Sequence, residues 1–409
     1  MSLRTGSEFE LFDIAGIRIA VDLSWLIVFA LVFWSLTFGY FPNLHPGFPW
    51  TEYLAVGLGA TLLFFGSVLL HELSHALVAN RLGETVKRIS LFIFGGMAHM
   101  SGEPASARSE FLIAGVGPLT SLLLGALFWS IPHAIPAMSY WPMWVSVFTY
   151  LGFINIALAV FNLLPGFPLD GGRLLRAALW ARSKNFVKAT ATASDWGRGI
   201  AYGLIGLGAI EIFFGSLMGG LWLIFIAFFL RNAAIASYQS VVTEQALQGV
   251  WVKRIMAANP TTIPANCTVA RAIDDYFLRY GYGGYPVTSD GRVVGLISLS
   301  DARGCPAEER YHWVVGDCMR PLDASTRIAP TAPAMQALRQ MFETGAGRLL
   351  VMDGDELVGL ISRSAIARLL VLRGEANVEL GTGKDGPRDA SARARQADGH
   401  ATSLLQESL

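Results

Sequence analysis

Long apolar segments alternate with short polar loops over the first 240 residues of the chain, and an ordinary mixed pattern follows. Apolar segments of about 18 residues or more are long enough to cross a bilayer as helices. Six such segments are expected, at residues 23–41, 53–76, 111–132, 144–164, 199–216 and 220–237. The pattern therefore predicts a polytopic α-helical membrane domain, with about six transmembrane helices, over residues 23–240.

Basic residues are distributed unevenly among the loops between these segments. Loops 42–52, 133–143 and 217–219 contain no Lys or Arg, whereas the loops that alternate with them contain many. Because cytosolic loops carry the excess of basic residues, we expect a multi-pass protein of the cytoplasmic membrane with both termini in the cytosol. The composition agrees, since 15% of the residues are charged, against about 25% in soluble proteins. The net charge of zero argues neither for nor against nucleic acid, and no nucleic-acid partner is expected.

Two short segments have the composition of strands rather than of membrane spans. "FDIAGIRIAVDLSW" alternates apolar and polar residues before the first span, so residues 1–22 are expected to form a cytosolic N-terminal strand region. "RISLFIFGGMAHM" (88–100) is too short to span, is rich in β-forming residues and is interrupted by Gly95 and Gly96. We expect this segment to form a hairpin that dips back into the membrane.

The chain repeats itself after residue 250. "VVGLISLSDAR" (293–303) and "LVGLISRSAIAR" (357–368) align at an offset of 64 residues. This repeat indicates a tandem βαββα domain over residues 250–372, with halves at about 250–305 and 313–372. Residues 373–409 are polar and poor in aromatic residues, and we expect them to form a disordered tail.

The stretch "LLHELSHA" (69–76) places three ionisable side chains in an apolar span. Residues i and i+4 share one helix face, so His71 and His75 can direct two imidazoles at one point, with Glu72 beside them. Two zinc ligands and a carboxylate that takes a proton from water at the metal are the chemistry of an HExxH motif. A chance match is the alternative, but three ionisable groups inside a span would be penalised without a function.

A second polar motif, "NLLPGFPLDGGR" (162–173), ends the fourth span. The two motifs are expected at the cytosolic ends of their spans and therefore at the same depth in the membrane. A catalytic zinc needs a third protein ligand, and Asp170 is the obvious donor, which predicts one zinc ion per chain. The Asn162 amide can donate a hydrogen bond to an oxyanion, and a helix cap or a helix–helix hydrogen bond is its alternative role.

Together, "HELSHALVA", "GGMA" and "NLLPGFPLDGGR" resemble the site-2 protease family of intramembrane zinc metalloproteases, in the branch with a C-terminal pair of CBS domains. The resemblance implies that His71, His75 and Asp170 bind zinc. It implies that Glu72 acts as general base and later as proton donor to the leaving amine. Asn162 would help to hold the scissile carbonyl.

The same resemblance concerns the substrate. The hairpin residues Gly95, Gly96 and Met97 would offer a strand edge to an unwound substrate segment, because a helical peptide bond is closed to attack. Substrates of the family are membrane-bound regulatory proteins, such as anti-sigma factors or tethered transcription factors. The product would then be a signal released into the cytosol.

The repeat after residue 250 resembles a CBS pair, a module whose halves bind adenine nucleotides between them. In such pairs a Ser or Thr hydroxyl and an Asp three residues later contact ribose and phosphate. The first half has Ser298 and Asp301, whereas the second half has Ser362 followed by Ala365. The resemblance implies one nucleotide site, and it leaves open a pair that only forms a homodimer or docks on the membrane domain. An Asp after a strand also commonly caps the next helix.

The sequence thus predicts a membrane domain followed by an α/β tandem CBS domain, and an intramembrane zinc endopeptidase that cleaves the transmembrane segment of a regulatory protein. Two alternatives remain. A CBS-regulated transporter would have polar residues spread over several spans, and a catalytically silent scaffold would have lost Glu72 or a ligand. The roles of His99, Asp195 and Glu211 stay open.

Overall fold

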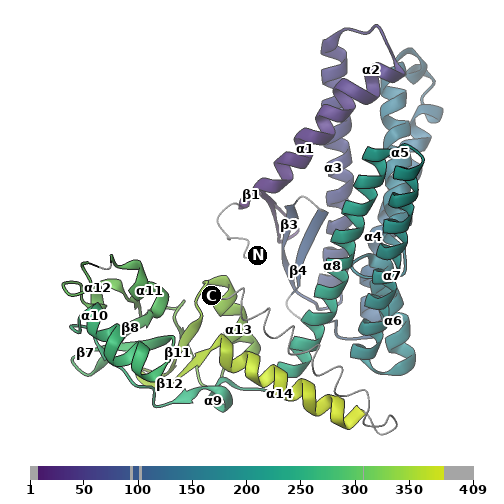
Figure 1. The fold of residues 1–409 in the computed structure, drawn as a ribbon. Helices are drawn as coiled ribbons and strands as arrows, with labels where there is room; N and C mark the ends of the chain where they lie inside the picture. The colour runs from purple at the N-terminus through teal and green to yellow at the C-terminus, as the bar shows by residue number, and fades with distance from the viewer. Residues whose placement is uncertain (1–7, 93–94, 101–103, 307, 382–409) are drawn as a thin grey trace. The chain divides into compact units, whose positions relative to one another are not determined.

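The computed structural model describes residues 8–92, 95–100, 104–306 and 308–381, and these form two compact units that meet in the sequence between Val242 and Thr243 (Figure 1). The first unit consists of long helices and one small sheet. The second unit is built from short strands and helices in two similar halves.

The first unit contains fourteen elements among the described residues, the last of which ends beyond the unit's boundary. In chain order they are β1 (Glu8–Ile14), β2 (Ile17–Asp22), α1 (Leu23–Ser35), the π-helical turn η1 (Leu36–Tyr40), α2 (Phe41–Leu44), α3 (Trp50–Arg81), β3 (Val86–Phe92), β4 (Gly95–Met100), α4 (Ala107–Ala134), the 3₁₀ turn η2 (Pro136–Tyr140), α5 (Pro142–Asn162), α6 (Asp170–Ser183), α7 (Phe186–Phe213) and α8 (Leu217–Leu247).

Five helical segments among the described residues are long and apolar enough to cross a membrane: Leu23–Leu44, Trp50–Arg81, Ala107–Ala134, Pro142–Asn162 and Leu217–Leu247. The other expected span, 199–216, lies mostly in α7 but is not among the five. Four glycines and Glu211 within it, and Arg198 just before it, lower the hydropathy of this part of the helix. Helix α3 has 32 residues and is therefore about 48 Å long. This exceeds a hydrocarbon core of about 30 Å, so α3 is more than long enough to cross a bilayer.

Helix α4 packs against three other helices, α3, α5 and α6. It begins with a capping box, in which Ser106 and Ser109 satisfy each other's backbone amides. At the contact with α5, a Cβ atom on Gly125 or on Gly152 would lie 3.2 Å from the other residue's carbonyl oxygen. Small residues that allow such close backbone contact are typical of helix packing in membranes. Helix α4 is therefore held tightly among the helices that carry the polar motifs.

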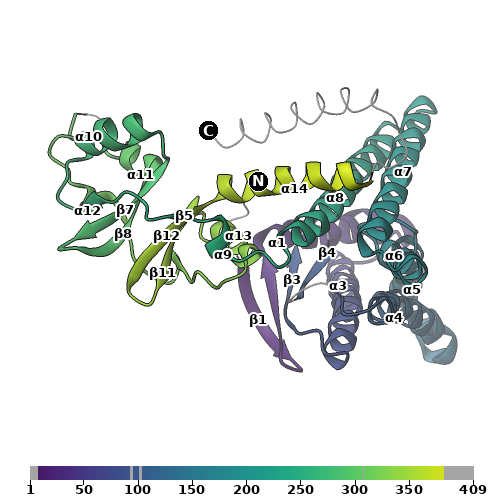
Figure 2. The same ribbon diagram turned by 90° about the horizontal axis from the view of Figure 1, so that it is seen from below.

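The four strands of the first unit form one sheet in the order β1-β2-β3-β4. The pairs β1–β2 and β3–β4 are antiparallel and β2–β3 is parallel, which confirms the expected strand pair and hairpin. Ile17, Ile19 and Ile89 on the sheet are fully buried and pack with Leu73 and Ala76 of α3. Both ribbon views show the sheet beside α1 and α3 (Figure 2). Strand β4 forms an edge of the sheet, next to the HExxH helix.

The second unit consists of short elements. In chain order they are α9 (Val252–Ile255), β5 (Ala257–Ala258), β6 (Ile263–Pro264), α10 (Val269–Ala272), the π-helical turn η3 (Ile273–Leu278), β7 (Gly284–Ser289), β8 (Arg292–Ser298), α11 (Leu299–Gly304), α12 (Val315–Cys318), β9 (Arg320–Pro321), β10 (Arg327–Ile328), α13 (Ala334–Glu343), β11 (Arg348–Asp353), β12 (Glu356–Ser362) and α14 (Arg363–Gly381). Residues 373–381, expected to be disordered, are thus helical, and residues 382–409 of the expected tail lie outside the described residues.

The two halves of the second unit exchange their first strands. One sheet has the order β6-β7-β8-β9 and the other the order β10-β11-β12-β5. Strand β5 precedes the first half's own sheet but pairs with β12 of the second half, and β9 from the start of the second half pairs with β8 of the first. Each half therefore completes the other half's sheet.

Candidate metal centre

Three side chains from two distant parts of the chain meet beside the C-terminal third of α3. His71 and His75 lie one turn apart on α3, and Asp170 is the first residue of α6. The Nε2 atoms of the two imidazoles are 3.2 Å apart. Asp170 Oδ2 lies 3.2 Å from His71 Nε2 and 3.3 Å from His75 Nε2. The structure thus brings together the three residues that the sequence predicts as metal ligands.

The spacing of these three donor atoms fits a zinc ion. In a tetrahedral site with bonds of about 2.0–2.1 Å, neighbouring ligand atoms lie about 3.3 Å apart. The three observed distances of 3.2, 3.2 and 3.3 Å form a nearly equilateral triangle of this size. Both imidazoles are buried, with 4% and 5% of their surface exposed. Two imidazoles and one carboxylate also form a donor set that zinc accepts in catalytic sites.

Asp170 is brought to the histidines by the loop between α5 and α6. Gly171 and Gly172 follow it, and a Cβ at Gly171 would collide with the backbone of Leu163 and Leu164. A Cβ at Gly172 would likewise collide with the backbone of residues 166–167. The first turn of α6 can therefore fold back against its own loop only because both residues are glycine.

Glu72 lies beside the histidines but contacts a different element. The backbone of Gly96 in β4 packs against the Glu72 side chain. A Cβ at Gly96 would lie 2.8 Å from the Glu72 Cδ atom, so the strand backbone approaches this carboxylate closely only because residue 96 is glycine. The predicted general base is therefore adjacent to the predicted substrate strand.

A cavity of about 680 Å³ contains all of these groups. The three ligand residues, Glu72, Gly96 and Asn162 line it. Its remaining walls are largely apolar and include Leu158 and Phe161 from α5 and Ile226 and Phe229 from α8. An apolar cavity with a few polar groups that converge on one point is typical of an active site.

Some predicted or unassigned residues lie elsewhere. Gly95 and Met97 are in β4 on either side of Gly96, and their surroundings lie outside the described parts of the structure. His99 is in β4 as well, and its side chain lies outside the described parts of the structure. Asp195 forms an exposed ion pair with Arg198 on α7. Glu211 lies on the same helix, also outside the cavity lining.

Two further side chains at the site were not predicted from the sequence. Arg173 lines the cavity, and its position one turn after Asp170 on α6 was a usable signal. Ser121 of α4 makes a 2.9 Å hydrogen bond between its Oγ atom and His71 Nδ1. Ser121 gave no local signal, because it lies 50 residues from its partner in an ordinary apolar helix.

In the second unit, Ser298 and Asp301 contact each other. Ser298 caps α11 through Asp301 N, and the Asp301 carboxylate accepts hydrogen bonds from the Ser298 amide and hydroxyl. Ser362 occupies the same place before α14 and accepts from Ala365 N. The capping role considered for this Asp is therefore realised.

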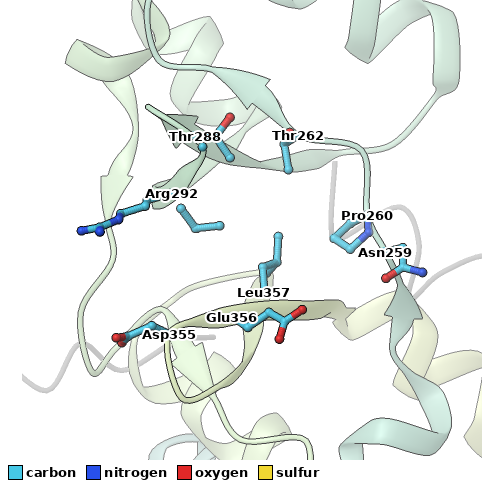
Figure 3. A pocket seen from close by; sticks show the side chains of 10 residues that line it. Asn259, Pro260, Thr262, Thr288, Arg292, Asp355, Glu356 and Leu357 are labelled. Carbon is cyan, nitrogen blue, oxygen red and sulfur yellow. The ribbon is translucent and has the colours of Figure 1, made fainter.

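A cleft of about 700 Å³ lies between the two halves of the second unit (Figure 3). Thr262 and Thr288 of the first half face Glu356 and Leu357 of the second across it. The residues that line this cleft include neither Ser298 nor Asp301. The cleft is consequently separate from the predicted nucleotide contacts.

Comparison with known proteins bears on both units. The profile of peptidase family M50 matches residues 59–137 and 133–204, and the CBS domain profile matches residues 252–307 and 315–372. A protein of Mycobacterium tuberculosis named "Putative zinc metalloprotease Rip3" is 37% identical over 359 residues, which cover 87% of this chain and 91% of that protein. The chain belongs to peptidase family M50. The resemblance to site-2 proteases with a CBS pair is confirmed.

This M50 peptidase is also similar to a more distant relative and to a solved structure. "Zinc metalloprotease MJ0392" of Methanocaldococcus jannaschii is 28% identical over 374 residues, covering 89% of this chain and 96% of that protein. The solved structure titled "Site-2 Protease from Methanocaldococcus jannaschii" is 27% identical, with a TM-score of 0.40, and covers 56% of this chain and 95% of that chain. The M50 peptidase is a metalloprotease with several apolar helices of membrane-spanning length and a tandem CBS domain.

Proposed function

We propose that this M50 peptidase is an intramembrane zinc endopeptidase that cleaves the transmembrane segment of a membrane-bound regulatory protein. The observation that carries the proposal is the triangle of His71, His75 and Asp170, which shares one largely apolar cavity with Glu72. Helices α3, α4, α5 and α8, which contribute to the cavity wall, are long enough to cross a bilayer. A buried polar site of this kind is costly unless it has a function.

The residues of the cavity can divide the reaction among them. His71 and His75 would hold zinc through Nε2, and Asp170 through Oδ2. Zinc bound there supplies a Lewis acid that polarises the scissile carbonyl and lowers the pKa of water. Glu72 takes a proton from the attacking water and later delivers it to the leaving amine. Asn162, on the cavity wall, donates its amide to the oxyanion of the tetrahedral intermediate.

The edge of β4 provides a place for the substrate backbone. A substrate segment that unwinds into an extended strand can pair with the backbone of Gly95, Gly96 and Met97, as in other cases of strand addition. Gly96 packs closely against Glu72, so a strand paired there would pass close to the general base. This supports a substrate that is helical in the membrane and extended in the site.

The distribution of basic residues among the loops supports a proposal for the location and partners of the enzyme. The basic loops support a position in the cytoplasmic membrane with both termini and the CBS pair in the cytosol. The substrate would then be a single-span protein, such as an anti-sigma factor or a tethered transcription factor, whose cytosolic part is released. A homodimer through the CBS pair is compatible with this arrangement.

Replacement of Glu72 tests the enzymatic proposal. The full-length protein in detergent would be incubated with a single-span substrate, and its zinc content measured. Glu72→Gln should keep about one zinc per chain. Its cleavage rate should fall by about 10²–10⁴-fold or more, because this is the usual contribution of a general base. Glu52→Gln, in the first turn of the same helix, should cleave like wild type. Wild-type protein without zinc, or cleavage that survives in Glu72→Gln, would refute the proposal.

We further propose that the CBS pair binds an adenine nucleotide through the first half. Arg348 of the second half supports this, because its guanidinium lies against Gly283 and Gly284, and Gly284 pairs with Ser298. Burial lowers the pKa of Arg348, and no ion pair of the described residues involves it. A phosphate is the kind of anion that would neutralise this guanidinium.

Nucleotide binding can be measured with AMP and ATP by equilibrium dialysis. Ser298→Ala and Arg348→Ala should each weaken binding at least tenfold. Ser362→Ala removes the equivalent helix cap from the second half and should leave binding unchanged. Equal affinity in all four proteins, or none in wild type, would leave the CBS pair with a structural or dimerising role.

A further inference from the structure

Helix α4 provides none of the three metal ligands, yet it contacts both histidines. We propose that Ser121 of α4 is a positioning residue for the metal centre, whose hydroxyl oxygen accepts the Nδ1 proton of His71 and so directs the Nε2 lone pair at the metal. This inference rests on the proposed zinc site. It adds a requirement on a helix that the HExxH and Asp170 motifs do not include.

Three positions spaced four residues apart on α4 face the two imidazoles. The Ile113 carbonyl oxygen lies 2.6 Å from His75 Nδ1, and Ser121 Oγ lies 2.9 Å from His71 Nδ1. Gly117 lies between them in sequence, and a Cβ there would sit 2.8 Å from His71 Nε2 and closer still to the His75 ring. Residues i and i+4 share a helix face, so one stripe of α4 packs directly against the histidines.

The two hydrogen bonds determine which nitrogen of each imidazole is free. A neutral imidazole has one N–H donor and one lone pair. A backbone carbonyl can only accept, so the Ile113 contact requires a proton on His75 Nδ1 and leaves the Nε2 lone pair free. Both Nε2 atoms point at Asp170 Oδ2, so His71 must bind metal in the same way. Its Nδ1 proton then needs an acceptor, and Ser121 Oγ is the atom in place.

Ser121 is also the member of this stripe that mutation can test. The Ile113 acceptor is a backbone atom and survives any substitution. Ser121 is fully buried, so solvent water does not replace its hydroxyl. Without this hydroxyl, the His71 Nδ1–H loses its acceptor. The other tautomer, which carries its proton on Nε2 and cannot bind metal through that atom, then becomes relatively more favourable. Groups that orient metal-bound histidines in this way typically contribute about 10–100-fold to metal affinity.

The test is zinc affinity of the purified full-length protein in detergent, measured by competition with a chelator. Ser121→Ala should bind zinc about 10–100-fold more weakly than wild type. Thr120→Ala is the matched control, since the Thr120 hydroxyl donates only to Val116 O of its own helix, and it should bind like wild type. Cleavage by Ser121→Ala should recover when excess zinc is added.

Melting of the metal-free proteins separates positioning from general stability. Ser121→Ala and Thr120→Ala each lose one hydroxyl of α4 and should melt at similar temperatures without zinc. Wild-type zinc affinity in Ser121→Ala would overturn the inference while the zinc site stands. Weak zinc binding accompanied by a much lower melting temperature of the metal-free Ser121→Ala protein would also overturn it, in favour of a structural role. Failure of the wild type to bind zinc would instead refute the proposed function.

Discussion

Glu72 and Asp170 are two carboxylates on one cavity, and they differ in what they contact. Asp170 Oδ2 lies within 3.3 Å of both imidazoles, whereas Glu72 packs against the backbone of Gly96. A ligand must point at the metal, and a general base must be close to it without being bound. The different contacts of the two residues agree with this division of roles.

A buried ion pair lies away from the metal centre. Arg176 of α6 donates to Glu110 of α4 through Nε, at 2.7 Å, and through Nη2. The guanidinium also lies over the rings of Phe167 and Phe186. Neither charged side chain is more than 9% exposed. This ion pair joins the helix that contacts the histidines to the helix that carries Asp170.

Removal of one charge from this pair should be strongly destabilising. Glu110→Ala leaves the Arg176 guanidinium buried without its counter-charge, and we expect a loss of about 3–5 kcal/mol, seen as a large fall in melting temperature in detergent. The exposed Asp195–Arg198 pair provides the control, since Asp195→Ala should cost about 1 kcal/mol or less. Equal effects of the two substitutions would show that burial does not decide the contribution of these pairs.

At the level of elements, the loop between α5 and α6 is held by close backbone contacts. Gly172 of α6 and Gly197 of α7 approach the backbone around Phe167 from two helices, and a Cβ on either would collide with it. The loop therefore has little freedom, although it has no regular secondary structure. Its rigidity places Asp170 opposite α3.

Substitution of Gly172 should therefore act on the metal through this loop. Gly172→Ala pushes on the backbone of residues 166–167, displaces Asp170, and should weaken zinc binding at least tenfold in chelator competition. Gly199→Ala adds a Cβ in open space on α7 and should bind zinc like wild type, with slightly higher stability because alanine favours a helix. Normal zinc affinity in Gly172→Ala would show that the loop adjusts.

The elements also show what the sequence can and cannot predict. The hairpin at 88–100 and most spans can be predicted from local patterns. The β-forming residues of a strand and the apolar length of a span are both properties of one continuous segment. The i, i+4 spacing of His71 and His75 is local as well, and two prolines and two glycines mark Asp170. Ser121 and Gly117 depend on which helix packs against α3, and no pattern within α4 contains that information. The expected span at 199–216 is a different case, because its glycines and Glu211 lower the apolarity within the segment itself.

At the scale of the molecule, the chain joins a helical membrane unit to a compact unit of a different kind. The core of the second unit is itself shared between its halves. Val250 and Val252, at the start of the first half, are buried in one cluster with Ile328 and Leu349 of the second. Together with the exchanged strands β5 and β9, this cluster makes the two halves of the repeat mutually dependent.

A cut between the halves should therefore not separate them. A protease site inserted between Glu308 and Glu309, both exposed, would divide the chain, and we expect the C-terminal fragment to remain bound to the membrane fragment during size-exclusion chromatography. In urea the fragments should separate. Release of the C-terminal fragment without denaturant would show that the exchanged strands contribute little.

The exchange of β5 and β9 also limits how such a module can evolve. A repeat that arises by duplication usually yields two copies that could be lost, replaced or transferred singly. Here either copy alone would expose an unpaired strand edge, which invites aggregation. Selection must therefore act on the pair as one inherited block, so substitutions in one copy are constrained by the other. This holds even where the two copies have diverged in chemistry, as at Asp301 and Ala365.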